Sequence, residues 1–173
     1  VVLDLSRYEF PVSGLVSFKE ISEKMNRSSR TIVHHLEKKL PEEWIREQLE
    51  LEEGAKVWHV LRAREIDGER IILDRDFFSA KWVPDLTRTI CENSIYDYIE
   101  NDLGLSVSYA KKEIVVEEAD EEDRRYLDLH DYKHVVVVRN YVYLNDTTLI
   151  EYTESRHRLD KFRFVDFARR EKQ

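Results

Sequence analysis

Two arginines stand two residues apart at Arg62 and Arg64. Residues two apart in a β-strand point to the same face, so both guanidinium groups are predicted to lie side by side. Neighbouring cations repel each other unless an anion lies between them. Glu65, Asp74 or Asp76 can supply that anion as an ion pair within the protein. A bound phosphate or carboxylate can supply it too, since the planar guanidinium binds such groups through two donors. The residue pattern alone favours the internal ion pair.

The register of the hairpin that carries these arginines bears on the choice. Strands predicted at 57–66 and 70–78 flank Asp67-Gly68, which is the strongest hairpin signal in the sequence. A three-residue loop at 66–68 would put Asp74 on the face of the two arginines. A two-residue turn at 67–68 would put it on the opposite face. Both registers remain open from the sequence.

A second feature suited to anions is predicted at Ser94. Ser94 followed by Asp97 has the spacing of a capping box, at the start of a helix predicted over 94–102 and ended by Gly104. The first turn of a helix offers free N–H donors and the positive end of the helix dipole. Every capped helix has these properties, so the feature matters only if the fold brings Ser94 close to the arginines.

Polar residues occupy both faces of the strand predicted from residue 149 onward, because Glu151 alternates with Tyr152, Glu154 and Arg156. One face is expected to line a polar cavity, and an edge strand with both faces in water is the alternative. The acidic run at 117–123 is interpreted as the solvated start of a helix.

The histidines show no HExxH or other tight metal spacing, and His34 and His35 are expected on opposite faces of a strand. No GxSxG, Walker or GxGxxG motif occurs either. The sequence therefore predicts no catalytic residue, no metal site and no cofactor.

The overall composition narrows the class of protein. The 173 residues include 28 Lys plus Arg against 36 Asp plus Glu, a net charge of −8. This acidity argues against direct contact with nucleic acid, which needs a basic face. The single Cys91 excludes an internal disulfide. No apolar run approaches the roughly 18 residues of a membrane span, and no signal segment is visible, so a cytoplasmic location without membrane contact is expected.

The remaining pattern predicts one α+β domain over 1–173, an antiparallel β-sheet with flanking helices. No linker or internal repeat divides the chain. Helices are predicted at 17–25, from 41 to Gly54, at 94–102 and after 123. Strands are predicted at 31–36, 57–66, 70–78, 107–116, 135–138 and 149–152, with a final edge strand at 162–164.

Four motifs in order resemble a known family. They are Leu-Val-Ser-Phe at 15–18, Arg-x-Arg at 62–64, Ser-Ile-Tyr-Asp-Tyr-Ile-Glu-x-x-Leu-Gly-Leu at 94–105 and Arg-x-Asp-Lys-Phe-x-Phe at 158–164. Over essentially its whole length the chain resembles the effector-binding (UTRA) domain of the GntR-type bacterial repressors, HutC subfamily. The resemblance implies the chorismate lyase fold.

The resemblance further implies a homodimeric sensor without enzymatic activity. Its effector would be a sugar phosphate, with trehalose 6-phosphate as the leading candidate, whose binding releases operator DNA. The family's winged helix-turn-helix domain precedes this one and is absent from these 173 residues, so DNA contact is expected through that domain. The alternatives are a chorismate lyase-type enzyme acting on a small carboxylate, a sensor for another effector such as glucosamine 6-phosphate, and a dimerisation module without a ligand.

Carried over residue by residue, the resemblance implies two groups of effector contacts. The phosphate is expected at Arg62, Arg64, Ser94 and Ser17. The sugar is expected at Asp74, Tyr96, Glu151 and His157. His157 and Leu159 differ from the Tyr and Gly that the family has in this stretch.

Overall fold

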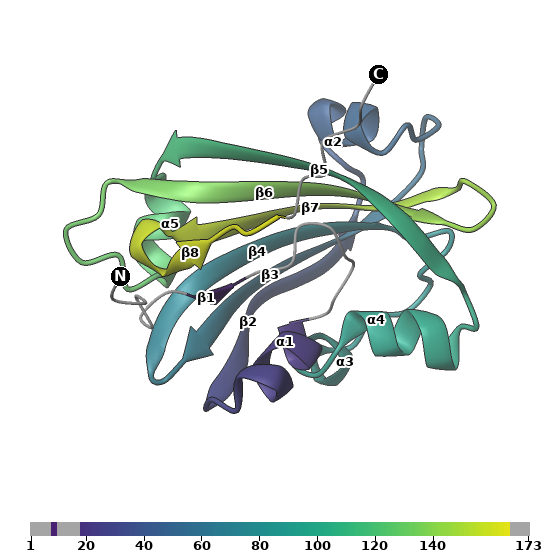
Figure 1. Ribbon diagram of the computed structural model, residues 1–173. Helices are drawn as coiled ribbons and strands as arrows, with labels where there is room; N and C mark the ends of the chain where they lie inside the picture. Colours follow the sequence, from purple (N-terminus) through teal and green to yellow (C-terminus); the bar gives the residue numbers. More distant parts are fainter. Residues whose placement is uncertain (1–7, 10–17, 167–173) are drawn as a thin grey trace, which may run out of the picture.

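One six-stranded antiparallel sheet forms the body of the molecule, with strand order β2-β3-β4-β7-β6-β5 (Figure 1). The computed structural model describes residues 8–9 and 18–166. The strands of the sheet are β2 (Ser29–Lys39), β3 (Val57–Ile66), β4 (Glu69–Ser79), β5 (Val107–Glu118), β6 (His134–Leu144) and β7 (Leu149–Arg158). The short strands β1 (Tyr8–Glu9) and β8 (Phe162–Arg163) form a separate parallel pair. The predicted α+β class with an antiparallel sheet is confirmed.

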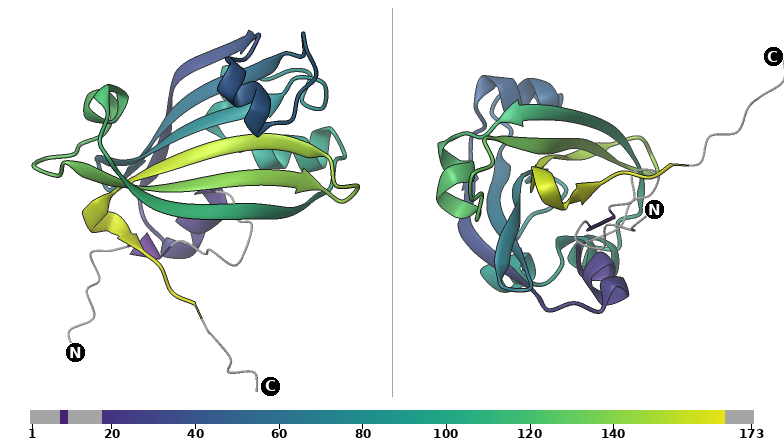
Figure 2. Two further views of the ribbon diagram at one scale, coloured as in Figure 1. Left: turned by 90° about the horizontal axis from the view of Figure 1, so that it is seen from above. Right: turned by 60° about the vertical axis from the view of Figure 1, so that its left-hand side comes forward.

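Helices cover both faces of this sheet, which is strongly curved (Figure 2). The concave face carries α1 (Phe18–Met25), α3 (Arg88–Glu92), and α4 (Ile95–Asp97) with the π-helical turn η1 (Tyr98–Asp102). The opposite, convex face carries α2 (Glu43–Gln48) and α5 (Glu121–Tyr126). A short 3₁₀ turn, η2 (Leu159–Lys161), joins β7 to β8. In the described part of the chain, no helix is long and apolar enough to cross a membrane.

The concave face has two apolar clusters at its ends. Near α4 and η1, Phe78 and Val142 of the sheet pack in one cluster with Ile99. Near α1, Ile72 packs in another cluster with partly buried Ile21. Burying one such side chain stabilises the fold by about 1.5–3 kcal/mol. The strand residues that face the same side between these clusters are polar, and burial of polar groups is costly unless they find partners.

The convex face is apolar beneath its two helices. Ile45 and Leu49, from α2 and its end, pack with Phe77 and Tyr152. A further cluster near α5 contains Leu127 together with strand residues Leu61, Ala63, Leu73, Val135 and Val137. The central strands β3, β4 and β7 are therefore buried on both sides, which removes the usual alternation of apolar and solvated residues there.

The hairpin of β3 and β4 has the predicted two-residue turn, but Asp74 lies on the face that was expected only for a three-residue loop. Asp67 and Gly68 have φ angles of 51° and 82°, and Ile66 lies opposite Glu69, so the turn has two residues. Positive φ at both positions is the requirement of a type I′ turn. A bulge then leaves Ile71 unpaired, after which Arg64 pairs with Ile72 and Arg62 with Asp74. The extra residue reverses the alternation, so Asp74 shares the face of the arginines despite the short turn.

Other elements differ from the predictions in their bounds. The helix predicted to run to Gly54 ends at Gln48, and Glu50 just beyond it has a φ angle of 51°, which a helix cannot continue. The helix predicted over 94–102 divides into α4 and η1. The short helix α3 was not predicted. Its N-cap is Thr87, whose hydroxyl accepts the N–H of Ile90.

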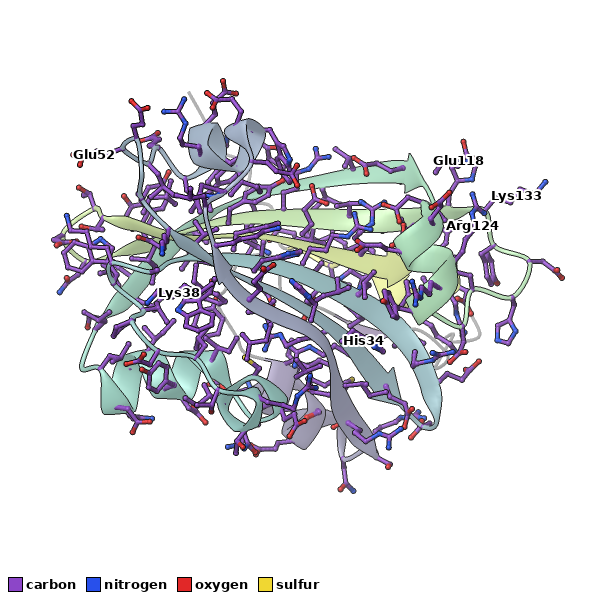
Figure 3. All side chains as sticks on the ribbon, turned by 180° about the vertical axis from the view of Figure 1, so that it is seen from behind. His34, Lys38, Glu52, Glu118, Arg124 and Lys133 are labelled. Carbon is purple, nitrogen blue, oxygen red and sulfur yellow. The ribbon has the colours of Figure 1, made fainter. Side chains whose placement is uncertain are left out.

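The prediction that His34 and His35 point to opposite faces is wrong. The pairing of β2 with β3 shifts between Val33 and His35, leaving His34 in a bulge. The ring of His34 lies 4.1 Å from that of Tyr126, and the ring of His35 lies 4.9 Å from that of His59. Both histidines therefore contact aromatic rings on the convex side, and Figure 3 shows His34 on this strand.

Candidate ligand-binding site

A pocket of about 140 Å³ opens on the concave face between α1, α4 and the sheet. Its polar lining residues are Lys19, Arg62, Arg64, Asp74, Asp76, Asn93, Ser94, Tyr96, Lys112, Asn140, Glu151, Thr153, Ser155 and His157. Of the eight predicted site residues, seven line this pocket, and Ser17 lies outside the described residues. The structure thus brings the predicted set together, while the role of each residue in binding stays a prediction.

Strand β7 supplies one wall of the pocket through alternate side chains. It lies between β4 and β6, so the edge-strand alternative is wrong. Glu151, Thr153, Ser155 and His157 face the pocket and lie opposite Phe78, Asp76, Asp74 and Ile72 of β4. Because side chains alternate along a strand, the intervening residues face the convex side.

The two arginines at the base of the pocket are each paired with an aspartate. Arg62 donates from Nε and Nη2 to Asp76 Oδ2, at 2.9 and 2.6 Å. Arg64 donates from Nε to Asp74 Oδ2 at 2.7 Å and from Nη1 to Thr31 Oγ1 at 2.7 Å. The internal ion pairs favoured by the sequence pattern therefore exist.

Hydroxyl groups of β7 complete the hydrogen bonding of the two aspartates. Ser155 Oγ donates to Asp74 Oδ1 at 2.6 Å, and Thr153 Oγ1 donates to Asp76 Oδ1. Each carboxylate thus takes an arginine on one oxygen and a hydroxyl on the other. Such full pairing is what a buried charge needs to be tolerated.

Among the residues that the structure describes, short hydrogen bonds do not occupy every N–H donor of either arginine. A guanidinium has five N–H groups, and each aspartate occupies one edge of its partner. Arg62 Nη1 makes only a long contact of 3.4 Å with the carbonyl of Cys91. Within the described part of the chain, Arg64 Nη2 makes no hydrogen bond to a protein acceptor. Burial opposes the charge of Arg62, but Asp76 and Asp74 outweigh it and raise the pKa.

Glu151 is the third acidic group in the pocket, and its surroundings favour the protonated form. Burial, followed by the negative charge of Asp76, raises the pKa of Glu151 to about 8. Tyr96 Oη donates to Glu151 Oε2 at 2.9 Å, which ties α4 to β7 across the pocket. Burial also raises the pKa of Tyr96, so its hydroxyl remains a donor.

His157 lies near the α1 end of the pocket and is kept neutral. Burial lowers its pKa to about 4, although the charge of Asp74 acts in the opposite direction. A neutral imidazole has one N–H donor and one acceptor nitrogen, which suits contact with hydroxyl groups.

Basic side chains outnumber acidic ones around the cavity. Lys19 and Lys112 join the two arginines, against the three acids Asp74, Asp76 and Glu151, and burial raises the pKa values of Asp76 and Glu151. Lys19 also contacts Asp97 at 3.1 Å, and both side chains are half exposed, so that pair is weak. The pocket is therefore suited to a small anion that also carries hydroxyl groups.

Sequence reasoning missed several pocket residues. Lys19, Lys112, Asn140, Thr153 and Ser155 line the cavity but were not proposed as site residues. Thr153 and Ser155 could have been found, because they alternate with Glu151 and His157 on the same predicted strand. Lys112 and Asn140 could not, because their position depends on which strands become neighbours.

The convex face beneath α5 contains a separate buried ion network. Arg156 donates to Asp123 from Nε at 2.9 Å and from Nη2 at 2.9 Å, and from Nη1 to Glu117 Oε2 at 2.9 Å. Asp123 is fully buried and forms a capping box with Asp120. The prediction of a helix start is confirmed, but its description as solvated is wrong for Asp123. An exposed pair, Arg124 of α5 with Glu118 at the end of β5, lies outside this network (Figure 3).

The fold and the pocket define a domain with a polar cavity on the concave face of its sheet. The model of the UTRA domain matches residues 24–163. The HTH-type transcriptional regulator TreR of Bacillus subtilis is 59% identical over 172 residues, which is 99% of this chain and 72% of that protein.

Solved structures of related domains have the same fold. The effector-binding domain of the B. subtilis trehalose repressor superposes with a TM-score of 0.76 at 61% identity, over 83% of this chain and 99% of that one. The effector domain of PhnF from Mycobacterium smegmatis shares the fold, with a TM-score of 0.81 at 19% identity, over 94% of this chain and 99% of that one. The chain belongs to the UTRA domain family, and it is the effector-binding domain of a TreR-like transcriptional regulator. This family is regulatory and not enzymatic.

Proposed function

We propose that this domain senses a sugar phosphate, trehalose 6-phosphate, and that binding releases operator DNA. The observation that carries the proposal is the pair of buried arginines, each with an N–H donor that no described residue engages in a short hydrogen bond, in a pocket lined by more basic than acidic side chains. The trehalose repressor of B. subtilis, whose effector-binding domain is 61% identical to this chain, supports a trehalose derivative as the ligand.

The phosphate would bind the free N–H groups of Arg62 and Arg64. Charge-assisted hydrogen bonds of this kind are about twice as strong as neutral ones. Ser94 would add its hydroxyl proton, since its oxygen already accepts the N–H of Asp97 at 3.2 Å. Ser17 is proposed as a fourth contact on the family resemblance alone.

The sugar hydroxyls would meet Asp74, Tyr96, Glu151 and His157. Asp74 accepts hydrogen bonds, whereas protonated Glu151 can donate one, and neutral His157 can do either. A dianionic phosphate also repels ionised carboxylates, so the protonation of Glu151 at neutral pH favours binding of the anion.

Binding would act on a homodimer in the cytoplasm whose operator-reading winged helix-turn-helix domains precede this domain. The effector shifts the balance between two dimer arrangements only by its difference in affinity for them. Sedimentation of the chain with and without effector tests the dimer. A single monomeric species at all concentrations would contradict that part.

Thermal shift of the purified chain tests the ligand directly. Trehalose 6-phosphate is expected to raise the melting temperature more than trehalose or glucose 6-phosphate, because ligand binding stabilises the folded state. Arg64→Met should remove the shift, and Lys111→Ala, an exposed residue that faces away from the pocket, should not. Equal shifts by trehalose and its phosphate would sink the phosphate assignment, and a larger shift by glucosamine 6-phosphate would identify that effector instead.

A further inference from the structure

The wall of the pocket farthest from the arginines is formed by β5 and β6, and it presents two polar side chains. Lys112 of β5 and Asn140 of β6 are direct cross-strand partners, and both line the cavity. Both are partly buried, in contrast to the exposed neighbour Lys111, which faces the other side of the same strand. Burial lowers the pKa of Lys112, as expected for an ammonium group turned toward the interior.

This wall lies at a considerable distance from the arginines along the sheet. Strands β4, β7 and β6 separate β3 from β5, so four strand spacings of about 4.8 Å give roughly 19 Å along the surface. The sheet is strongly curved (Figure 2), and side chains from both walls line the same cavity. A ligand that contacts both walls must extend over the whole pocket floor.

The chemistry of the two walls is also different. The arginine wall combines paired guanidinium groups with two aspartates and suits a phosphate. The opposite wall offers an ammonium group with three donors and an amide with both donors and an acceptor. Val138, the β6 residue two before Asn140, adds an apolar surface to the same lining. This mixture of donors, an acceptor and an apolar patch matches a sugar ring, which has hydroxyl edges and C–H faces.

We propose that Lys112 and Asn140 form a distal subsite that binds the hydroxyl groups of a second sugar ring. With the phosphate over β3, the first ring lies above β4 and β7, and the second ring reaches β6 and β5. These two residues then select a two-ring sugar phosphate over a single-ring one. The inference rests on the proposed sugar-phosphate function. It names the residues of the same pocket that distinguish a two-ring ligand from a one-ring ligand.

Isothermal titration of the chain with trehalose 6-phosphate and with glucose 6-phosphate tests the subsite. Lys112→Met, which keeps the apolar stem, and Asn140→Ala should each weaken trehalose 6-phosphate roughly tenfold, the effect of one lost hydrogen bond to a charged or buried group. The affinity for glucose 6-phosphate should not change. Lys111→Ala is the matched control from the same strand and should leave both affinities unchanged. Circular dichroism and the melting temperature of each ligand-free variant check its folding.

The outcomes separate this inference from the proposed function. Equal weakening of both ligands by Lys112→Met would mean that Lys112 attracts the phosphate, and it would overturn the subsite. Unchanged binding of trehalose 6-phosphate to both variants would overturn it as well. If glucose 6-phosphate does not bind the unmodified chain, Lys112→Met must still weaken trehalose 6-phosphate for the subsite to stand. Failure of the unmodified chain to bind either sugar phosphate would instead refute the proposed function.

Discussion

Replacement of Arg64 by methionine is the sharpest test of how the pocket holds its charges. The side chains of Arg64 and Asp74 are 7% and 10% exposed, and their Nε–Oδ2 distance is 2.7 Å. Methionine keeps much of the volume but removes the guanidinium, so Asp74 loses its direct ionic partner and retains only the hydroxyl of Ser155. Breaking a buried pair in this way costs about 3–5 kcal/mol. That is a large share of the roughly 5–15 kcal/mol that stabilises a typical domain.

The double variant Arg64→Met with Asp74→Asn should recover most of that loss. Asparagine carries no charge, and its Oδ1 still accepts the hydroxyl of Ser155. We expect the double variant to lie within about 1 kcal/mol of the unmodified chain, because replacing both members of a buried pair is often neutral. Both variants should fail to bind the sugar phosphate, which separates the binding role of Arg64 from its role in stability.

Urea unfolding followed by circular dichroism measures these free energies. Arg30→Met is the matched control, because Arg30 of β2 pairs with Glu65 of β3, the strand of Arg64, but its side chain is 66% exposed. Its expected cost is below about 1 kcal/mol. The reasoning is refuted if Arg64→Met costs no more than Arg30→Met, or if the double variant is as unstable as the single one.

Three further substitutions test other parts of the molecule. Glu151→Gln should raise the free energy of unfolding at pH 8 by a few kcal/mol, on a scale of about 1.36 kcal/mol per pKa unit, and have no effect below pH 4.5. The reason is that the raised pKa of Glu151 makes the folded state lose stability as pH rises from 4.5 to 8. Equal urea midpoints of the two proteins at pH 8 would contradict this. The melting temperature should fall as pH is lowered from 6.5 to 4, because His157 binds a proton in the unfolded chain but not when it is buried. His157→Gln should make this fall smaller. An unchanged fall would exclude His157 as its cause. Asp123→Asn should cost about 3–5 kcal/mol in urea unfolding, because it removes the buried carboxylate that accepts from Nε and Nη2 of Arg156. The exposed control Asp102→Asn should change stability by less than about 0.5 kcal/mol, and an equal loss would show that the network beneath α5 is not stabilising.

Much of the local structure could be predicted because it depends on short-range patterns. The alternation around Arg62 and the Asp67-Gly68 turn predict β3 and β4 directly. The Ser94 cap is confirmed, since the capping hydrogen bond joins residues only three apart. Bulges were not predicted, because an extra residue at Ile71 or His34 leaves the surrounding alternation almost unchanged in the sequence.

The acidic run and strand β7 illustrate a second limit. A solvated helix start and a buried capping box have the same sequence pattern, and only the position of Arg156 beneath α5 buries Asp123. Similarly, polar residues on both faces of a strand fit either an edge strand or a central strand with two polar partners. The order of strands in the sheet decides between them, and that order depends on long-range packing.

The antiparallel α+β class, the two arginines on one strand face and the family resemblance all follow from the sequence, because each rests on residues that are close in the chain. Other features depend on the tertiary structure. These are the ion pairs of the arginines with Asp74 and Asp76, the central position of β7 with both faces buried, and the presence of Lys112 in the same pocket as Arg62. Each of them depends on contacts between residues that are distant in the chain. The strand order, the curvature of the sheet and the bulge at Ile71 produce these contacts. All three follow from burial of the whole apolar surface and not from any local sequence pattern.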